Sequence, residues 1–183
     1  MRQTRPMATD EPGRTAAADS DGTGTTQQPR PVRVRHAARV LLLDPAGRVL
    51  LMRYDDDSPN GRHWSTPGGG LDPGEDYRTA AARELAEETG WHDIELLSEV
   101  HRRAFDMAYR DVTVHQIERI YLARTSPELR PISGVAAMHA SDGIAAWRWW
   151  TPAELADTAE TIWPAELAAL IQAIGRSSDG QRR

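Results

Sequence analysis

The stretch GGLDPGEDYRTAAARELAEETGW, from Gly69 to Trp91, carries most of what can be inferred about this protein. Its second half predicts a helix from Tyr77 to Thr89, because apolar and small residues recur there at helical spacing. Gly90 is well placed to end that helix. The stripe expected to be buried consists of Ala81, Ala82, Leu85 and Thr89.

Three glutamates share one face of this predicted helix. Glu84, Glu87 and Glu88 stand at positions i, i+3 and i+4, where like charges destabilise an isolated helix by roughly 0.2–0.5 kcal/mol per pair. One explanation is a solvated face with ordinary salt bridges. The other is a divalent cation, since Mg²⁺ and Mn²⁺ prefer hard oxygen ligands and relieve the repulsion. The glycines at 68–70 would let the backbone pass close to such an ion.

The spacing of the charged residues favours the second explanation. Gly69 is followed after five residues by Glu75, and seven more residues lead to Arg83-Glu84-Leu85-Ala86-Glu87-Glu88-Thr89-Gly90. This arrangement resembles the Nudix box, the signature of the Nudix hydrolase family (MutT-like proteins). Only Trp91 departs from the pattern, because a branched aliphatic residue is usual there.

The resemblance implies a fold and an activity. The fold is α/β, the Nudix α/β/α sandwich with a mixed β-sheet between helices. The activity is metal-dependent hydrolysis of the diphosphate bond in a nucleoside diphosphate linked to another moiety, with Mg²⁺ or Mn²⁺ as cofactor. A rival interpretation is a catalytically silent Nudix-fold module that senses a nucleotide, although such modules usually carry a degraded box.

The resemblance also implies roles for the box residues. Glu87 and Glu88 resemble the main metal ligands, joined by the carbonyl of Gly69. Glu84 resembles a residue that binds metal or acts as general base, and Arg83 one that orients a box glutamate. Glu75 resembles a residue that stabilises the junction of loop and helix. The catalytic residues implied are Glu84, Arg83 and Glu87.

Residues outside the box give weaker signals about substrate binding. Arg53, Arg62 and Trp64 are candidates for phosphate and base contacts, although surface ion pairs and core packing are the usual roles of such residues. Nudix proteins often recruit one further acidic residue. Glu118 and Asp142 are both candidates here, and each has a structural alternative, a strand ion pair or a turn.

Composition narrows the functional class. The 183 residues carry a net charge of −5, which argues against a protein that mainly coats nucleic acid or anionic membranes. The chain has no cysteine, which excludes disulfides, thiolate nucleophiles and the isopentenyl diphosphate isomerases that share the fold. The expected partner is a nucleotide-type small molecule, with no nucleic acid and no membrane. Oligomeric state stays open, with a homodimer one possibility.

The rest of the chain predicts one domain between two tails. Residues 1–32 and 177–183 lack the apolar residues needed for a core and are expected to be disordered. No secretory signal or membrane span is evident, so a cytoplasmic protein is expected. Within the domain, 33–176, the remaining predicted elements are strands at 34–44, 48–54, 94–105, 112–124 and 145–150, a hairpin at 106–111, a capping box at Thr151–Glu154 and a helix at 164–174.

Overall fold

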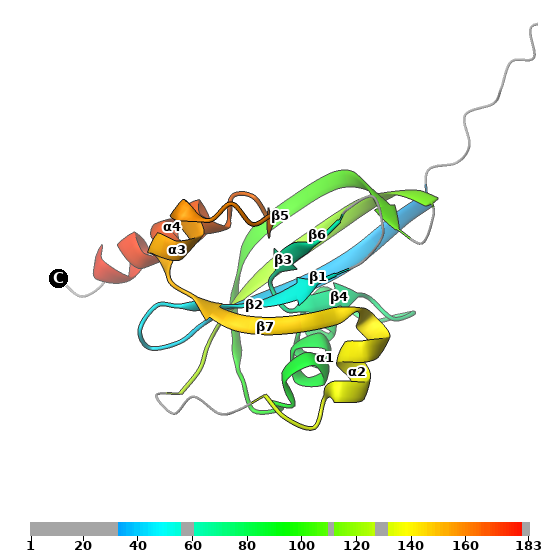
Figure 1. Cartoon of the computed structure of the whole chain (residues 1–183), viewed down its shortest axis with the longest axis horizontal. Coiled ribbons are helices and arrows are strands. Elements are labelled where there is room, and N and C mark those ends of the chain that lie inside the picture. Colours follow the sequence, from blue (N-terminus) through cyan, green and yellow to red (C-terminus); the bar gives the residue numbers. More distant parts are fainter. Residues whose placement is uncertain (1–32, 56–60, 110–111, 127–131, 181–183) are drawn as a thin grey trace, which may run out of the picture. The chain divides into compact units, whose positions relative to one another are not determined.

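The computed structural model describes residues 33–55, 61–109, 112–126 and 132–180. The described residues form an eight-stranded mixed sheet with four helices (Figure 1). The strands are β1 (Arg33–Leu43), β2 (Val49–Tyr54), β3 (His63–Ser65), β4 (Gly68–Gly70), β5 (Leu96–Tyr109), β6 (Val112–Arg124), β7 (Ile144–Trp150) and β8 (Ile162–Trp163). The helices are α1 (Tyr77–Thr89), α2 (Ala136–Asp142), α3 (Pro152–Asp157) and α4 (Leu167–Gly180).

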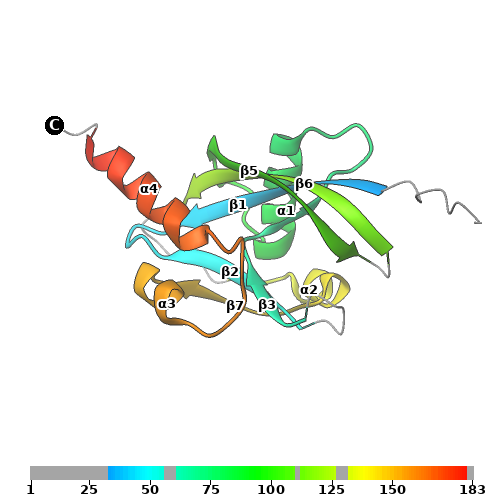
Figure 2. The same ribbon diagram turned by 90° about the horizontal axis from the view of Figure 1, so that it is seen from above.

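The sheet order is β5-β6-β1-β2-β3-β8, with β4 paired to β1 and β7 paired to β2. The β1–β6 and β3–β8 pairs are parallel, and the other pairs are antiparallel. Figure 2 shows the long β5 and β6 strands beside β1, with α3 and α4 toward one end of the sheet and α2 toward the other. The fold is therefore the α/β sandwich with a mixed sheet that the sequence predicts.

The sheet separates two hydrophobic clusters, and β1 contributes to both. Val40 and Leu42 pack on the side of α1, whereas Leu41 and Leu43 pack on the side of α3 and α4. Because alternate residues of a strand point to opposite faces, a strand buried on both sides needs an unbroken apolar run. This explains why residues 40–43 read Val-Leu-Leu-Leu.

Helix α1 has the predicted bounds. The Asp76 side chain caps its start by accepting hydrogen bonds from two backbone N–H groups, and Gly90 ends it in the left-handed conformation with φ of 75°. The predicted buried stripe is wrong at one position. Ala80 is buried and Ala82 is exposed, because Ala80 rather than Ala82 packs into the hydrophobic cluster with Ala81 and Leu85.

Other predictions are confirmed or corrected along the chain. The β1–β2 hairpin and the Thr151–Glu154 capping box are confirmed. Strand β5 continues to Tyr109, so most of the predicted hairpin at 106–111 is strand, paired with β6. Helix α4 starts three residues later than predicted and continues to Gly180, through residues assigned to a loose tail. Its apolar side chains Leu167 and Ile171 anchor it on the sheet.

Some predictions concern residues that the structure does not describe. The tail at 1–32 and the last three residues lie outside the described ranges.

The short elements β3, β4, β8 and α2 were not predicted, because each is too short to show a periodic pattern. Within the described ranges, no helix has the length and apolar character to span a membrane.

Candidate functional site

Strand β4 and helix α1 bring the two halves of the Gly69–Trp91 stretch together. Strand β4 pairs antiparallel with β1, with Gly69 opposite Ala38. A Cβ atom on Gly69 would lie 2.5 Å from Oε1 of Glu84, so any other residue there would displace the Glu84 carboxylate. Glycine is therefore the residue that lets the Glu84 carboxylate lie directly against the backbone of β4.

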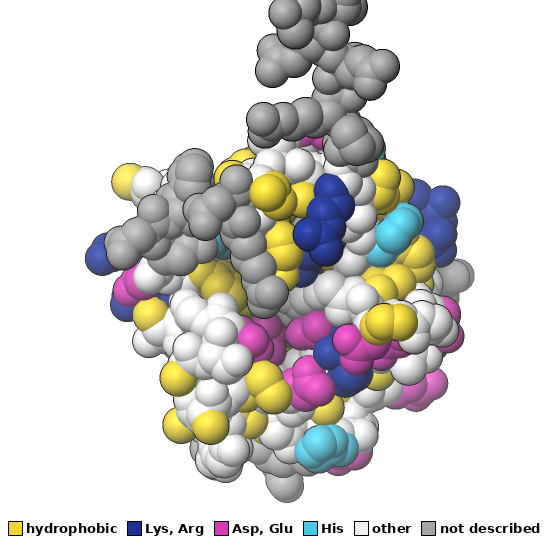
Figure 3. Space-filling model, turned by 90° about the vertical axis from the view of Figure 1, so that its right-hand side faces the viewer, with side chains coloured by type: hydrophobic (Ala, Val, Ile, Leu, Met, Phe, Trp, Pro, Cys, Tyr) yellow, Lys and Arg dark blue, Asp and Glu magenta, His cyan; other side chains and the backbone are white. Residues whose placement is uncertain are grey.

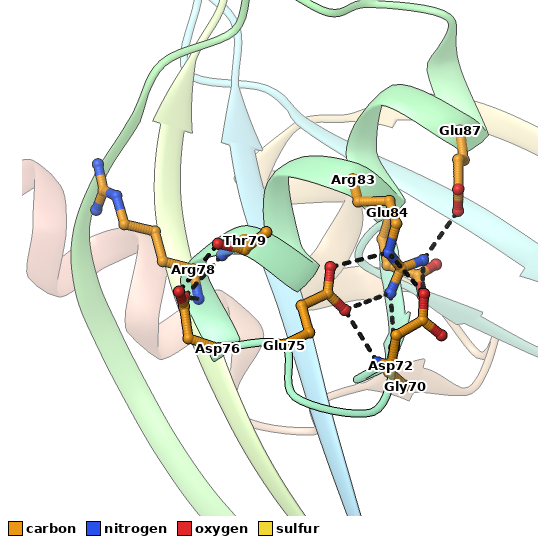
Figure 4. Close-up of polar contacts among 9 residues, drawn as sticks. All are labelled: Gly70, Asp72, Glu75, Asp76, Arg78, Thr79, Arg83, Glu84 and Glu87. Carbon is orange, nitrogen blue, oxygen red and sulfur yellow. Dashed lines mark hydrogen bonds and ion pairs between the residues drawn. The ribbon is translucent and has the colours of Figure 1, made fainter.

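Arg83 connects this strand to the acidic residues around it (Figure 4). Its Nε and Nη2 donate to the two carboxylate oxygens of Glu75 at 3.0 and 2.9 Å, and Nη2 also donates to the carbonyl of Gly70 at 2.9 Å. Its Nη1 donates to Glu84 and Glu87, both at 3.0 Å. These bonds raise the pKa of Arg83, and they lower the pKa of Glu75. One guanidinium thus ties three glutamates and the glycine strand into a single unit.

Glu88 is the buried member of the acidic face, with 2 % of its surface exposed. Its Oε2 accepts a hydrogen bond of 2.9 Å from the backbone N–H of Gly68, and its Oε1 accepts one of 3.2 Å from the Tyr54 hydroxyl. Burial raises the pKa of Glu88 to about 8, although Arg39 opposes the shift. Burying the negative charge of a carboxylate costs free energy. Carboxyl groups with pKa values shifted in this way cluster at functional sites.

Glu84 interacts electrostatically with Glu88 and with a further acidic residue on α2. Burial raises the pKa of Glu84, and the charges of Glu87 and Asp142 add to this shift while Arg83 opposes it. Asp142 lies at the end of α2 and lines the same cleft as the α1 glutamates. Of the two acidic candidates outside the box, Asp142 is therefore the one that lines the cleft and whose charge acts on Glu84.

The described acidic side chains of the cleft have the chemistry of a divalent-cation site, but they are not arranged as one. Within the described ranges, no three acidic or histidine side chains are arranged to hold a metal ion. Instead, Arg83 bridges Glu84 and Glu87, and Glu88 bonds to Gly68. The chemistry nevertheless fits a hard cation, because three carboxylates on one helix face lie beside a glycine strand, and burial disfavours the negative charge of Glu84 and Glu88.

The residues predicted to bind substrate do not line this cleft. Trp64 is buried in the core against Trp150. Arg53 and Arg62 pair with Asp55 at 2.9 and 3.3 Å, and the Arg62 side chain is 62 % exposed. In the structure, Trp64 therefore packs in the core, and Arg53 and Arg62 form ion pairs.

Glu118 was predicted to contact substrate, and it is instead fully buried beneath the cleft with 0 % exposed. Its carboxylate accepts bonds from Arg39 at 2.8 Å and Arg103 at 2.7 Å. Burial alone would raise the pKa of Glu118, but the two arginines hold it below its ordinary value. Arg39 also donates to the carbonyls of Thr66 and Gly68 at 2.8 and 3.3 Å. Glu118 thus supports the arginine that holds the start of β4.

Sequence reasoning missed Arg39 and the neighbouring Arg35. The available signal was the alternation of arginines at 33, 35 and 39, which places them on one face of a strand. Without the β1–β6 and β1–β4 pairings, nothing showed that Arg35 and Arg39 line the same cleft as the glutamates of α1.

The cleft that these elements enclose has a volume of about 1100 Å³. It is bordered by β1, the β4 strand and following loop, α1, α2 and the ends of β5 and β6. Figure 3 shows acidic side chains gathered beside a hollow in this face of the molecule, with basic side chains on the other side of the hollow. The site is therefore acidic at one end and basic at the other.

Comparison with known proteins gives the family. A model of the NUDIX domain matches residues 33–171. An RNA pyrophosphohydrolase of Dinoroseobacter shibae is 33 % identical over 136 residues, which cover 68 % of this chain and 81 % of the relative. An RNA pyrophosphohydrolase of Caulobacter vibrioides is 52 % identical over 58 residues, which cover 32 % of this chain and 33 % of the relative. The chain thus spans about a third of the length of that second relative.

Solved structures agree with the fold. The MutT protein of Methanosarcina mazei Go1 has a TM-score of 0.61 at 18 % identity, covering 82 % of this chain and 99 % of that one. A MutT NUDIX hydrolase of Burkholderia pseudomallei has a TM-score of 0.52 at 26 % identity, covering 75 % of this chain and 96 % of that one. The chain therefore belongs to the NUDIX family and is an enzyme, a MutT-like Nudix pyrophosphohydrolase that acts on phosphoric anhydride bonds.

Proposed function

We propose that this enzyme hydrolyses the diphosphate bond of a nucleoside diphosphate linked to another moiety, such as a nucleoside triphosphate or a nucleotide derivative, with the help of Mg²⁺ or Mn²⁺. One observation carries the proposal. The carboxylates of Glu84, Glu87 and Glu88 lie beside the glycine strand in one cleft, and burial raises the pKa of two of them.

We propose Glu84, Glu87, Glu88 and the carbonyl of Gly69 as the groups that hold the cation. A divalent cation there would neutralise charge on the diphosphate and lower the pKa of a bound water. Burial raises the pKa of Glu84 and Glu88, so a further positive charge would stabilise both carboxylates, which supports this assignment.

Each protein group has a proposed task in the reaction. Glu84 either joins the cation site or accepts the proton of the attacking water, a task that suits a carboxylate whose pKa is raised. Arg83 keeps its two bonds to Glu75 and so holds the loop before α1 in place. Asp142, which lines the same cleft from α2, is the further acidic residue that we propose for the site.

The end of an RNA chain is a second candidate substrate, and a specific comparison favours it. The Dinoroseobacter shibae relative, whose chain is matched over 81 % of its length, is named an RNA pyrophosphohydrolase. A 5′-triphosphate on RNA contains the same anhydride bonds as a free nucleotide. A net charge of −5 disfavours tight binding along an RNA backbone, so recognition would be confined to the 5′ end.

The test is a substrate panel combined with metal removal. Nucleoside triphosphates, ADP-ribose, dinucleoside polyphosphates and a short 5′-triphosphorylated RNA are incubated with Mg²⁺ or Mn²⁺, and with excess EDTA. We expect turnover that EDTA abolishes. We also expect Glu87→Gln and Glu88→Gln to lower kcat at least a hundredfold and to weaken Mn²⁺ binding measured by electron paramagnetic resonance.

Glu160→Gln is the matched control, because Glu160 is exposed and lies outside the cleft. It should behave as wild type in both assays. A Glu88→Gln enzyme with unchanged Mn²⁺ affinity and turnover would refute the metal assignment. Nucleotide binding without turnover of any substrate would refute the hydrolase proposal and favour a sensing module.

A further inference from the structure

The basic end of the cleft is organised around Arg35, on β1. Arg35 lies opposite Gln116 in the β1–β6 register, and its Nη1 donates to the Gln116 side-chain oxygen at 2.5 Å. Its guanidinium also stacks on Tyr109, with Cζ 4.5 Å from the ring centroid. A planar guanidinium that donates a hydrogen bond on one side and stacks on an aromatic ring has little rotational freedom left. Arg35 is therefore fixed in place before any ligand arrives.

Gln116 itself is fixed from the other side. It is 1 % exposed, and its side-chain nitrogen donates to Oε2 of Glu118 at 2.9 Å. Because a carboxylate only accepts hydrogen bonds, this contact determines which end of the amide faces Glu118. The amide oxygen is thereby directed at Arg35. The buried Glu118 thus sets the position of Arg35 through one intermediate residue.

The charge of Arg35 is only partly offset by the described residues, through Tyr109 and the more distant carboxylate of Glu118. Arg39 and Arg83, which line the same cleft, both pair with carboxylates. Among the described acidic residues, none forms an ion pair with Arg35. Burial lowers the pKa of Arg35, so its surroundings disfavour the charge that it carries. A partly buried cation without a counter-ion, facing a cleft, is suited to bind an anion.

The position of Arg35 relates it to the acidic end. A Cβ atom on Gly70 would lie 3.2 Å from Nη2 of Arg35, just as one on Gly69 would meet Glu84. Because successive residues of a strand point to opposite faces, Arg35 and Glu84 lie on the two sides of β4, and both line the cleft. Because β4 pairs with β1 and with no other described strand, a ligand lying across its other edge can contact both.

We propose that Arg35 is an anion subsite for a phosphate beyond the anhydride bond that is cleaved, and that it makes the enzyme prefer substrates with three or more consecutive phosphates. Gln116 is the positioning residue of this subsite. The inference rests on the proposed function for its catalytic consequence, because it concerns the same cleft. The chemical class that it selects is a polyphosphate chain, either a nucleoside 5′-triphosphate or a longer phosphate bridge.

Binding in the absence of metal tests the subsite separately from catalysis. Inorganic tripolyphosphate is titrated into the full-length protein by calorimetry in excess EDTA. We expect wild type and Glu87→Gln to bind it, and Arg35→Gln to bind at least tenfold more weakly. Arg102→Gln is the matched control, because Arg102 lies on the neighbouring β5 strand and pairs with Glu99. It should bind as wild type does.

Kinetics test the preference for phosphate number. With Arg35→Gln we expect KM for a nucleoside triphosphate to rise at least tenfold, while kcat/KM for the diphosphate ADP-ribose changes less than twofold. Arg35→Lys keeps the charge and provides a second variant if thermal unfolding shows that Arg35→Gln is poorly folded. It should bind tripolyphosphate with an affinity between those of wild type and Arg35→Gln.

Three outcomes would overturn the proposal. The first is that wild type does not bind tripolyphosphate, and the second is that Arg35→Gln binds it as tightly as wild type does. The third is that Arg35→Gln loses kcat/KM equally on triphosphate and diphosphate substrates. An absence of hydrolysis alongside tripolyphosphate binding that depends on Arg35 would refute the proposed function and leave the anion subsite standing.

Discussion

Replacing Glu118 by glutamine tests the buried network beneath the cleft. Glu118 is 0 % exposed and accepts hydrogen bonds from Arg39, Arg103 and Gln116 at 2.8, 2.7 and 2.9 Å. The substitution keeps the shape of the side chain but removes its charge. Two partly buried guanidinium groups then lose the only carboxylate with which either forms an ion pair among the described residues.

The expected loss in free energy of unfolding is large. Removing one partner of a buried ion pair costs about 3–5 kcal/mol, because the remaining charge is left without compensation. A domain of this size has a total stability of roughly 5–15 kcal/mol. The variant should therefore unfold at a clearly lower urea concentration, and its midpoint temperature should fall by roughly 6–20 °C.

The effect should also depend on pH in a defined direction. The pKa of Glu118 is lowered in the folded protein, so the unfolded chain binds a proton at higher pH than the folded one. The stabilisation is present above the unfolded pKa of about 4.3 and is lost as pH falls through the folded value. The difference between wild type and Glu118→Gln should therefore shrink below about pH 4.

The measurement is urea unfolding followed by circular dichroism at pH 7 and at several acidic pH values. Glu99→Gln is the control, because Glu99 is partly exposed and pairs with Arg102 and Arg119 near the surface. It should lose about 1 kcal/mol or less. A loss below about 1 kcal/mol for Glu118→Gln, or a difference that stays constant into acid, would refute this reasoning.

Three further predictions concern single sites. Glu88→Gln should make the metal-free protein more stable than wild type at pH 8 but not at pH 4.5. The folded pKa of Glu88 is about 8, so the free energy of unfolding of wild type falls as pH rises from the unfolded pKa of Glu88 to its folded pKa. A difference in stability between the two proteins that stays constant across this pH range would contradict the prediction. Gly90→Ala should destabilise by about 1–2 kcal/mol, since φ is 75° and a Cβ would lie 2.9 Å from the Ser133 carbonyl, and a thermal midpoint equal to that of wild type would argue against the strain. Thr151→Ala should cost about 1 kcal/mol in chemical unfolding by removing the α3 capping box with Glu154, and a change within error would mean that α3 adds little to stability.

The sequence predicted the parts of the site that are local in the chain. Gly69, Glu75 and Arg83 lie within fifteen residues of one another, so spacing alone indicated that a loop and a helix bring them together. The bounds of α1 followed from its apolar periodicity and from the glycine that ends it. These features depend on backbone geometry over a few residues, which residue type largely determines.

The basic side of the cleft could not be predicted in the same way. Arg35 and Gln116 are 81 residues apart, and their contact depends on the parallel register of β1 and β6. Trp64 shows the same limit, because tryptophan suits both base stacking and a core. Only the pairing of β3 with β2 and β8 decides that its ring is buried.

The burial of β1 on both faces has a consequence for how this strand tolerates mutation. A strand with one solvated face accepts polar residues at every second position, and a library of random variants would show that alternation. From Val40 to Leu43 every position serves one of the two cores, so a polar residue should be eliminated at each of them. Toward Arg33 the strand has a cleft on one side, and there selection for substrate, rather than for folding, should determine which substitutions survive.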